Sequence, residues 1–159
     1  MTQKNKKGKP VSASKVEMTE LVLPGQTNTL GNIFGGRVMQ LIDIAAGVTA
    51  TRHARKTVVT VFIDQIHFKN PIKMGQIVIL HSRIEYAGNT SMEIGVDVFS
   101  ENPLTGKQIH ATKAHLTFVA LNQKGEPSPV PHLILETELD KELYEKAKIR
   151  RQQRIRQEP

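Results

Sequence analysis

The stretch GGRVMQLIDIAAGVTATRH, residues 35–53, has the spacing of a long α-helix. Its apolar and small residues return every three to four positions, which gathers them on one face of a helix. That face holds Val38, Ile42, Ala45 and Thr49, with Leu41 beside it. We therefore predict a helix from residue 35 to about residue 53, the only long helix before the carboxyl end.

The chain after this helix has the pattern of consecutive β-strands. Four segments are rich in β-branched or other apolar residues, and they cover residues 58–68, 76–86, 91–100 and 107–121. Residues alternate between two faces of a strand, which puts Val78, Leu80, Ile84 and Tyr86 on one face and Met92, Ile94, Val96 and Val98 on another. A shorter extended segment, residues 18–23, precedes the helix and stops at Pro24-Gly25. Turn residues join the segments, so we expect antiparallel pairing.

One helix followed by a run of strands can bury itself only against a face of their sheet. We predict an α+β fold in which a curled antiparallel sheet wraps around the helix. The core of such a domain is modest. We therefore expect the remaining edge or face to be buried in a dimer or a larger oligomer.

Residues 138–157 are a second helix candidate. Acidic residues come early in this segment and basic residues late, an order that complements the helix dipole. Leu139, Leu143, Ala147 and Arg150 mark a thin apolar stripe that could dock on a neighbouring surface. A solvated, partly frayed helix fits the same pattern equally well.

The charge of the chain is concentrated at its beginning. The formal net charge is +7, and residues 1–15 contain five lysines and no acidic residue. We interpret residues 1–15 as a disordered basic tail, residues 16–131 as one domain and residues 132–159 as a charged helical extension. With the excess charge in the tail and no tryptophan in the chain, we do not expect nucleic-acid binding.

The chain contains no cysteine, which excludes disulfides, thiolate metal sites and a cysteine nucleophile. A reducing cytoplasm is therefore the expected location. No apolar run follows the basic start, so neither a secretory signal nor a membrane anchor is expected.

Asp43 stands alone as a charge in the helical stretch between residues 38 and 51. Its neighbours at helical spacing are mostly small, among them Gly36, Ala46, Gly47 and Ala50. The space beside the carboxylate can admit a substrate or a closely packed backbone. Asp43 is thus either a general base or a structural residue.

The residues before the helix offer weaker signals. Gly35-Gly36 places free amides at a helix start, where they can stabilise an oxyanion, although glycines there often serve only a turn. Asn28 can donate its amide to a carbonyl or a water, or act as a loop asparagine. The histidines have no ligand spacing, and nucleophile-elbow and phosphate-loop motifs are absent, so we expect no metal and no cofactor.

Several ordered motifs together identify a family. Asn28-Thr29-Leu30-Gly31-Asn32-Ile33-Phe34-Gly35-Gly36, Leu41-Ile42-Asp43 and Thr51-Arg52-His53-Ala54 resemble the cytosolic acyl-CoA hydrolase group of hotdog thioesterases. The resemblance continues through Val59-Thr60, Gly88-Asn89-Thr90-Ser91-Met92-Glu93, Phe118-Val119-Ala120-Leu121 and Pro129-Val130-Pro131. It implies a hotdog fold, hydrolysis of fatty acyl-CoA in fatty acid metabolism, and homohexamers built as trimers of dimers.

The resemblance also implies roles for single residues. Asn28 and Asp43 would form the catalytic pair, one from each subunit of a dimer, with Asp43 activating water or attacking the thioester. Thr60 would orient the water or Asp43, and the backbone amide of Gly36 would meet the carbonyl oxygen. Basic and amide-rich surface residues would hold coenzyme A, which is part of the substrate, and the candidates are Arg52, Arg83, Gly88, Asn89, Ser91 and Lys113.

Two other functions are compatible with part of the sequence pattern. A hotdog hydratase would need a histidine near the helix start, and none precedes His53. A regulatory module that binds acyl-CoA or a nucleotide without hydrolysis would make use of the basic tail and the thin stripe of the last helix.

Overall fold

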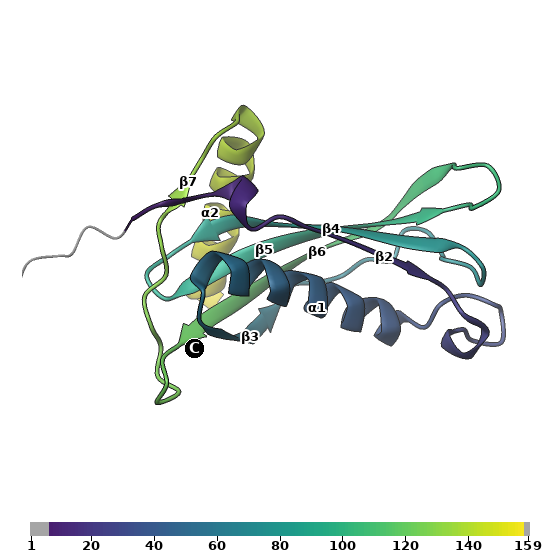
Figure 1. The fold of residues 1–159 in the computed structure, drawn as a ribbon, viewed down its shortest axis with the longest axis horizontal. Coiled ribbons are helices and arrows are strands. Elements are labelled where there is room, and N and C mark those ends of the chain that lie inside the picture. The colour runs from purple at the N-terminus through teal and green to yellow at the C-terminus, as the bar shows by residue number, and fades with distance from the viewer. Residues whose placement is uncertain (1–6, 158–159) are drawn as a thin grey trace, which may run out of the picture.

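Long strands and two long helices make up the described part of the chain, residues 7–157 of a computed structural model (Figure 1). In chain order the elements are β1 (Lys9–Pro10), η1 (Val11–Ala13), β2 (Val16–Leu21), η2 (Pro24–Gln26), α1 (Gly35–Ala54), β3 (Thr57–Ile63), β4 (Ile77–Ala87), β5 (Ser91–Glu101), β6 (Gln108–Leu121), β7 (Leu133–Ile134) and α2 (Glu138–Gln157). The main sheet has the order β2-β4-β5-β6-β3, and all of its pairs are antiparallel. The predicted curled antiparallel sheet, long helix and C-terminal helix are confirmed. Within residues 7–157, neither helix combines the length and hydropathy that a membrane crossing requires.

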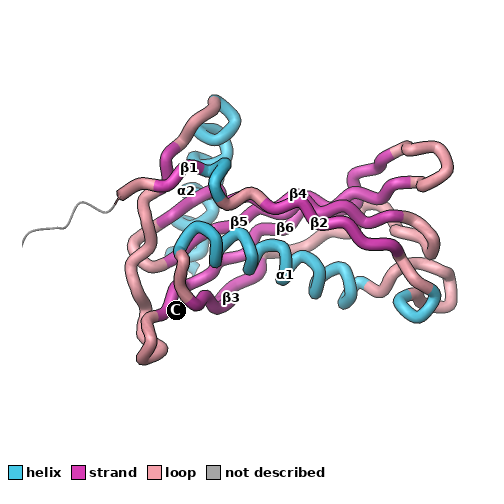
Figure 2. The backbone as a smooth tube through the Cα atoms, in the orientation of Figure 1, coloured by secondary structure: helices cyan, strands magenta, loops and turns pink. Residues whose placement is uncertain are grey.

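Helix α1 lies along one face of the sheet and supplies the core (Figure 2). The predicted face is buried: Val38, Leu41, Ile42, Ala45 and Thr49 are all at most 1% exposed. Ser82 interrupts the apolar face of β4, and its hydroxyl lies 2.7 Å from the Thr49 hydroxyl in the core. The polar interruption is therefore hydrogen-bonded across the helix–sheet interface, as buried polar groups require.

A β-bulge separates Tyr86 from the apolar face predicted for β4. Ile84 pairs with Ile94, but Tyr86 pairs with Glu93, so the register shifts by one residue between them. The shift turns Tyr86 to the outer face of the sheet, where its ring meets Tyr144 of α2 at a centroid distance of 5.1 Å. The alternating pattern predicted the wrong face for this residue because a bulge breaks the period of two.

The strand predicted over residues 58–68 ends earlier, at Ile63. Beyond it the chain still follows β6 through separate hydrogen bonds, from the Asp64 amide to the His115 carbonyl and from the Lys69 amide to the Ala111 carbonyl. Residues 64–69 therefore run beside β6 without a regular ladder.

Helix α2 packs on the outer face of its own sheet and is held largely by charged groups. Its start is a capping box, in which the Asp140 amide donates to the Thr137 hydroxyl and Asp140 accepts from the Thr137 amide. Asp140 also pairs with Arg83 of β4. In the predicted apolar stripe Ala147 is buried but Leu139 is 52% exposed, so docking relies on ion pairs more than on apolar contacts.

The predicted disordered tail differs from the structure in its second half. Residues 1–6 lie outside the described residues, but β1 pairs in parallel with β7, and Val11 is 1% exposed. Burial of Val11 and Ser14, with the backbone bonds to residues 132–134, orders a segment whose composition alone indicated a solvated chain.

Candidate active site

Asp43 lies on the third turn of α1, on the side of the helix that faces β3. Its Oδ1 accepts a hydrogen bond of 2.7 Å from the hydroxyl of Thr60 on β3. Thr60 is the only hydrogen-bond partner of the Asp43 side chain within residues 7–157. Both residues are half-buried. One carboxylate oxygen is therefore fixed by a neutral donor, which leaves the second oxygen available to a water or a substrate.

A cleft of about 390 Å³ opens beside this pair. Gly47 leaves the cleft open on its helix side, because a Cβ atom at this position would lie 3.7 Å from the ring of Phe118 on β6 and would fill part of the space. Ile44, Val48 and Val58 supply apolar walls, and Arg52 stands at the end of the helix. The small residues around Asp43 thus leave an open cleft rather than a closely packed backbone.

Gly36 occupies an open position at the start of α1. The N-cap residue Phe34 makes no side-chain hydrogen bond to the helix, and no atom lies within 4 Å of where a side chain at Gly36 would begin. The first amides of a helix lack partners within the helix. The Gly36 amide is therefore exposed for an oxygen atom that carries partial negative charge.

Asn28 lies in the loop that leads into α1. Its Oδ1 accepts hydrogen bonds from the amides of Leu30, at 3.0 Å, and Asn32, at 3.1 Å. This is the turn role expected for a loop asparagine, and it also fixes the orientation of the side-chain NH₂ group. Asn28 lines a separate cavity of about 240 Å³ together with Gly35 and Phe68.

Within one chain, Asn28 and Asp43 do not face the same cavity. Asp43 lies eight residues beyond Gly35, which is about 12 Å along the helix axis at 1.5 Å per residue. The structure therefore brings Asp43 together with Thr60, and Asn28 together with Gly35 at the start of the helix.

The surface around the Asp43 cleft is unusually apolar. Ile44 and Val48 on α1 are 46% and 38% exposed, and Val59 and Val61 on β3 are 39% and 55% exposed. β3 is also an edge strand of the sheet. An exposed apolar surface beside an unpaired strand edge is typical of a subunit interface.

The predicted coenzyme A residues lie in three different places. Arg52 lines the Asp43 cleft. Arg83 and Lys113 lie on the outer face, where Arg83 pairs with Asp140 and Lys113 with Glu85 and Asp97. Gly88, Asn89 and Ser91 form the β4–β5 turn, where Gly88 donates its amide to Ser91 and approaches Arg151 of α2. Only Arg52 is brought to Asp43 within the chain.

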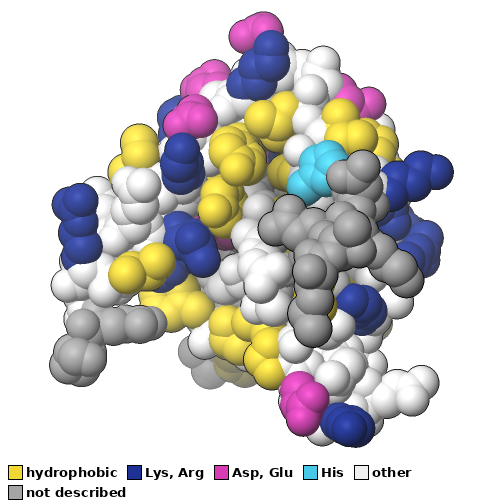
Figure 3. Space-filling view, turned by 90° about the vertical axis from the view of Figure 1, so that its left-hand side faces the viewer, with side chains coloured by type: hydrophobic (Ala, Val, Ile, Leu, Met, Phe, Trp, Pro, Cys, Tyr) yellow, Lys and Arg dark blue, Asp and Glu magenta, His cyan; other side chains and the backbone are white. Residues whose placement is uncertain are grey.

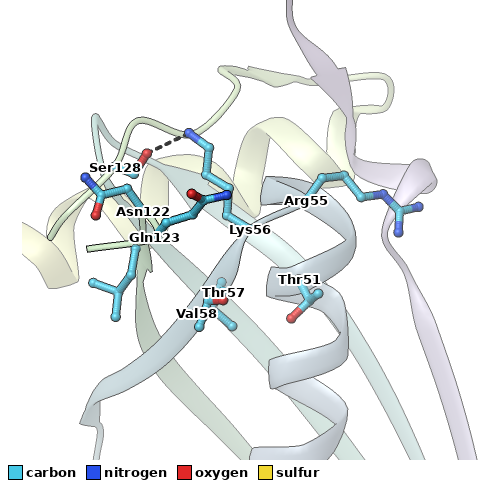
Figure 4. Close-up of a pocket in the computed structure, with 9 residues that line it drawn as sticks. Thr51, Arg55, Lys56, Thr57, Val58, Asn122, Gln123 and Ser128 are labelled. Atoms are coloured by element: carbon cyan, nitrogen blue, oxygen red, sulfur yellow. Dashed lines mark hydrogen bonds between the residues drawn. The ribbon is translucent and has the colours of Figure 1, made fainter. Parts of the chain in front are cut away.

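A larger basic cavity adjoins the cleft, and the sequence did not indicate it. Its volume is about 850 Å³, and it shares Thr51 and Val58 with the Asp43 cleft (Figure 4). Arg55 and Lys56, in the turn between α1 and β3, supply its charge. Arg55 caps the helix in the left-handed conformation, with φ of 52°. The adjacent basic pair after Ala54 was the available signal.

One group of potential metal ligands occurs within residues 7–157, formed by Glu85, Glu93 and His115 on the outer face. Arg150 donates to both carboxylates, at 2.9 and 2.7 Å, and Arg154 also donates to Glu93. Guanidinium groups therefore occupy the positions that a cation would need. The cluster holds α2 on the sheet.

His53 is fully buried at the end of α1, and its Nε2 lies 2.9 Å from the Pro131 carbonyl oxygen. Burial lowers the pKa of His53, and Lys9 lowers it further, although the Pro131 hydrogen bond opposes the shift. In the unfolded chain the His53 imidazole takes up a proton near pH 6.5, whereas in the folded chain its lowered pKa keeps it neutral at that pH. The free energy of unfolding therefore falls as pH drops below about 6.5.

We expect the free energy of unfolding to fall by up to about 1.4 kcal/mol per pH unit below pH 6.5. Urea unfolding between pH 5 and pH 7.5, at one protein concentration, measures it. His53→Gln should flatten the profile, whereas His67→Gln, at an exposed position, should leave it unchanged. An equally steep profile in the His53 variant would show that other groups cause the acid sensitivity.

Thr60→Val tests the hydrogen bond to Asp43. Loss of one donor to a carboxylate should lower kcat for any reaction in which Asp43 takes part by about 10- to 100-fold, with little change in KM. Thr60→Ser should recover most of the activity because it restores the hydroxyl. The two variants should unfold at similar denaturant concentrations. Equal activities of the valine and serine variants would show that the Thr60 hydroxyl does not contribute to the function of Asp43.

Residues 30–107 match the family described as the thioesterase superfamily. The acyl-CoA thioester hydrolase YkhA of Bacillus subtilis, itself uncharacterized, is 42% identical over 125 residues, which cover 79% of this chain and 73% of that protein. The mouse cytosolic acyl coenzyme A thioester hydrolase is 37% identical over 140 residues, which cover 87% of this chain but only 37% of that longer protein.

A solved structure shows the same fold. The crystal structure of an apo hexameric acyl-CoA thioesterase superposes with a TM-score of 0.91 and 43% sequence identity, covering 94% of this chain and 96% of that one.

Proposed function

The chain belongs to the thioesterase superfamily, among its acyl-CoA thioester hydrolases, and from that premise we propose that it hydrolyses acyl-CoA at a site centred on Asp43. The resemblance noted in the sequence is thereby confirmed. The observation that carries the proposal is the hydrogen bond of 2.7 Å between Thr60 and Asp43, at the edge of an open and largely apolar cleft.

The reaction adds water to the thioester carbonyl and breaks the carbon–sulfur bond. Asp43 either takes a proton from the attacking water or attacks the carbonyl carbon itself, and water then hydrolyses the resulting anhydride. In both routes the carboxylate must be ionised, oriented and close to the carbonyl. Thr60 orients it, and the Thr60 hydroxyl leaves the second oxygen free to react.

The developing oxyanion needs hydrogen-bond donors on the other side of the carbonyl. The Gly36 amide is exposed at the positive end of the α1 dipole, and the Asn28 side chain is held beside the same end of the helix. Donors of this kind stabilise the charge that forms as the carbonyl is attacked. We assign Gly36 and Asn28 to this role.

These two halves belong to different subunits in our proposal. Asn28 and Gly36 from one subunit face Asp43 and Thr60 from its partner, because Asn28 and the Asp43–Thr60 pair line separate cavities within one chain. The exposed apolar residues of α1 and β3 supply the contact surface. We further propose that the dimers assemble into hexamers as trimers of dimers, supported by the hexameric relative.

The substrate in this proposal is a fatty acyl-CoA, and the site of action is the cytoplasm. Apolar residues line the cleft, so an acyl chain is favoured over a polar group next to the thioester. The name of the mouse relative supports a cytosolic role.

Release of free thiol from acyl-CoA substrates of increasing chain length tests the function. We expect turnover by the purified chain without added metal. A complete lack of thiol release with every chain length, from a protein that is folded and oligomeric, would refute the proposal.

A further inference from the structure

A β-bulge interrupts β3 directly after Thr60. Thr60 pairs with Phe118 of β6 and Phe62 pairs with Thr117, so Val61 is an extra residue in this strand. Bulges of this kind change the direction of the side chains around them and are common beside active sites. The bulge therefore decides which face of the sheet the residues after Thr60 occupy.

Thr60 and Phe62 lie on opposite faces of the sheet, although residues two apart in a regular strand share a face. Thr60 lines the Asp43 cleft on the α1 face. Phe62 lines a cavity of about 450 Å³ on the outer face, together with the last turns of α2. The bulge thus places an aromatic ring outside the cleft, at a position where the alternating pattern would direct it inward.

Arg154 of α2 holds the Phe62 ring on the outer face. Its guanidinium carbon lies 5.1 Å from the ring centroid, within the range of a cation–π interaction. The same guanidinium donates to the buried carboxylate of Glu93 at 3.1 Å. Glu93 of β5 and Phe62 of β3 both pair with Thr117 of β6, on its two sides. Arg154 therefore spans three neighbouring strands, with a carboxylate on one side and the ring on the other.

Apolar contact alone would not fix this ring in one place. Figure 3 faces the end of the molecule where β3 begins, and hydrophobic side chains are exposed there between Lys and Arg side chains. Phe62 is itself exposed, as are Val61 and Ile155, which line the same cavity. A ring on such a surface can pack in several ways, whereas a guanidinium anchored by a carboxylate gives it one definite partner.

The alternative position for the ring is the cleft. If the pairing of residues 57–60 continued beyond Thr60, Phe62 would pair with Leu116 of the core and turn to the α1 face, because a shift of one residue exchanges the two faces of a strand. We propose that Arg154 is a positioning residue that keeps the Phe62 ring out of the Asp43 cleft, an inference that rests on the proposed hydrolysis at Asp43. α2 thereby keeps the cleft open from the opposite face of the sheet.

A ring that turns inward competes with the substrate for the cleft. Substrate binding selects the open state, so a partly closed population raises KM and leaves kcat at saturation unchanged. Arg154→Gln should therefore raise KM for acyl-CoA by about 3- to 10-fold, as expected from the loss of one partly exposed cation–π interaction. A misplaced Thr60 hydroxyl would instead lower kcat, so the two effects are separable.

Phe62→Ala tests whether the ring causes the effect. Added to Arg154→Gln, it should return KM close to the wild-type value, because an alanine that turns inward leaves the cleft open. A variant in which α2 had merely loosened would not regain function when a further contact is removed. Arg154→Lys, which keeps a cation beside Glu93, should retain most of the wild-type affinity.

Arg151→Gln is the matched control. It removes the same charge from the same helix, together with a cation–π contact of 5.4 Å to Tyr86 on β4, which two strands separate from β3. This control should leave KM unchanged. An equal rise of KM in Arg151→Gln would overturn the proposal, as would an unchanged KM in Arg154→Gln or a KM that Phe62→Ala does not restore.

A crystal structure of the Arg154→Gln variant keeps the test independent of catalysis. We expect the Phe62 ring on the α1 face, beside Asp43, in at least some of the subunits. If the wild type hydrolyses no acyl-CoA, the proposed function fails, and a ring found in the cleft of the variant still supports the role of Arg154. A ring that stays in the outer cavity in every subunit would contradict that role, whatever the activity.

Discussion

Replacing Asp43 by asparagine should lower kcat/KM for acyl-CoA hydrolysis by roughly 10²–10⁴-fold, the usual contribution of a positioned acid–base group. The substitution keeps the size of the side chain and its hydrogen bond from Thr60 but removes the ionised carboxylate. Neither a general base nor a nucleophile remains. Free thiol release at saturating and at limiting substrate measures kcat and kcat/KM separately.

Asp64→Asn provides the control for this variant. Asp64 follows β3, is also half-buried, and lies outside the cleft, with its carboxylate accepting a hydrogen bond from the Gln65 amide. We expect this control to keep nearly all of the activity. A folded Asp43→Asn variant with more than about a tenth of the wild-type kcat/KM would remove Asp43 from the catalytic role.

Arg150→Ala should lower the free energy of unfolding by about 2–4 kcal/mol. Arg150 bridges Glu85 and Glu93, whose side chains are almost fully buried beneath α2. Removal of one partner from a buried ion pair leaves a carboxylate without compensation, and this is strongly destabilising. The decrease in the free energy of unfolding is limited because the two carboxylates keep other partners, namely Lys113, His115 and Arg154.

Urea unfolding at a fixed protein concentration measures this effect, since subunit association contributes to stability. Arg156→Ala removes an exposed base from the same helix and should change stability by less than about 0.5 kcal/mol. Glu85→Gln/Glu93→Gln together with Arg150→Met should recover part of the loss, because it removes the buried charges with their partner. Equal unfolding midpoints for Arg150→Ala and the wild type would show that α2 is held by other contacts.

The helices and strands could be predicted because their burial follows a simple period. Val38, Ile42 and Thr49 repeat at helical spacing, and the sheet meets only that side of α1. Where the period breaks, the prediction was wrong. Tyr86 changes face at a bulge, and the segment before Val11 is ordered by the pairing of Lys9 and Pro10 with Leu133 and Ile134, far along the chain, which no local pattern can indicate.

The site was only partly accessible from the sequence. The open cleft beside Asp43 follows from small residues at helical spacing, but the contact with Thr60 depends on how β3 runs beside α1. In the sequence, Arg83 and Lys113 had no evident acidic partners and were therefore predicted to bind coenzyme A. Their acidic partners Asp140, Glu85 and Asp97 become neighbours only through the sheet and the docking of α2.

Mixed oligomers test whether each active site is shared between two subunits, as we propose. Asn28→Ala and Asp43→Ala subunits, each nearly inactive alone, are unfolded together and reassembled in equal amounts. Random pairing makes half of the dimers mixed, and each mixed dimer has one intact site of two, so about a quarter of wild-type activity should return. Thiol release that stays at the level of the separate variants, in oligomers shown to be mixed, would show that Asn28 and Asp43 do not act together across the subunit interface.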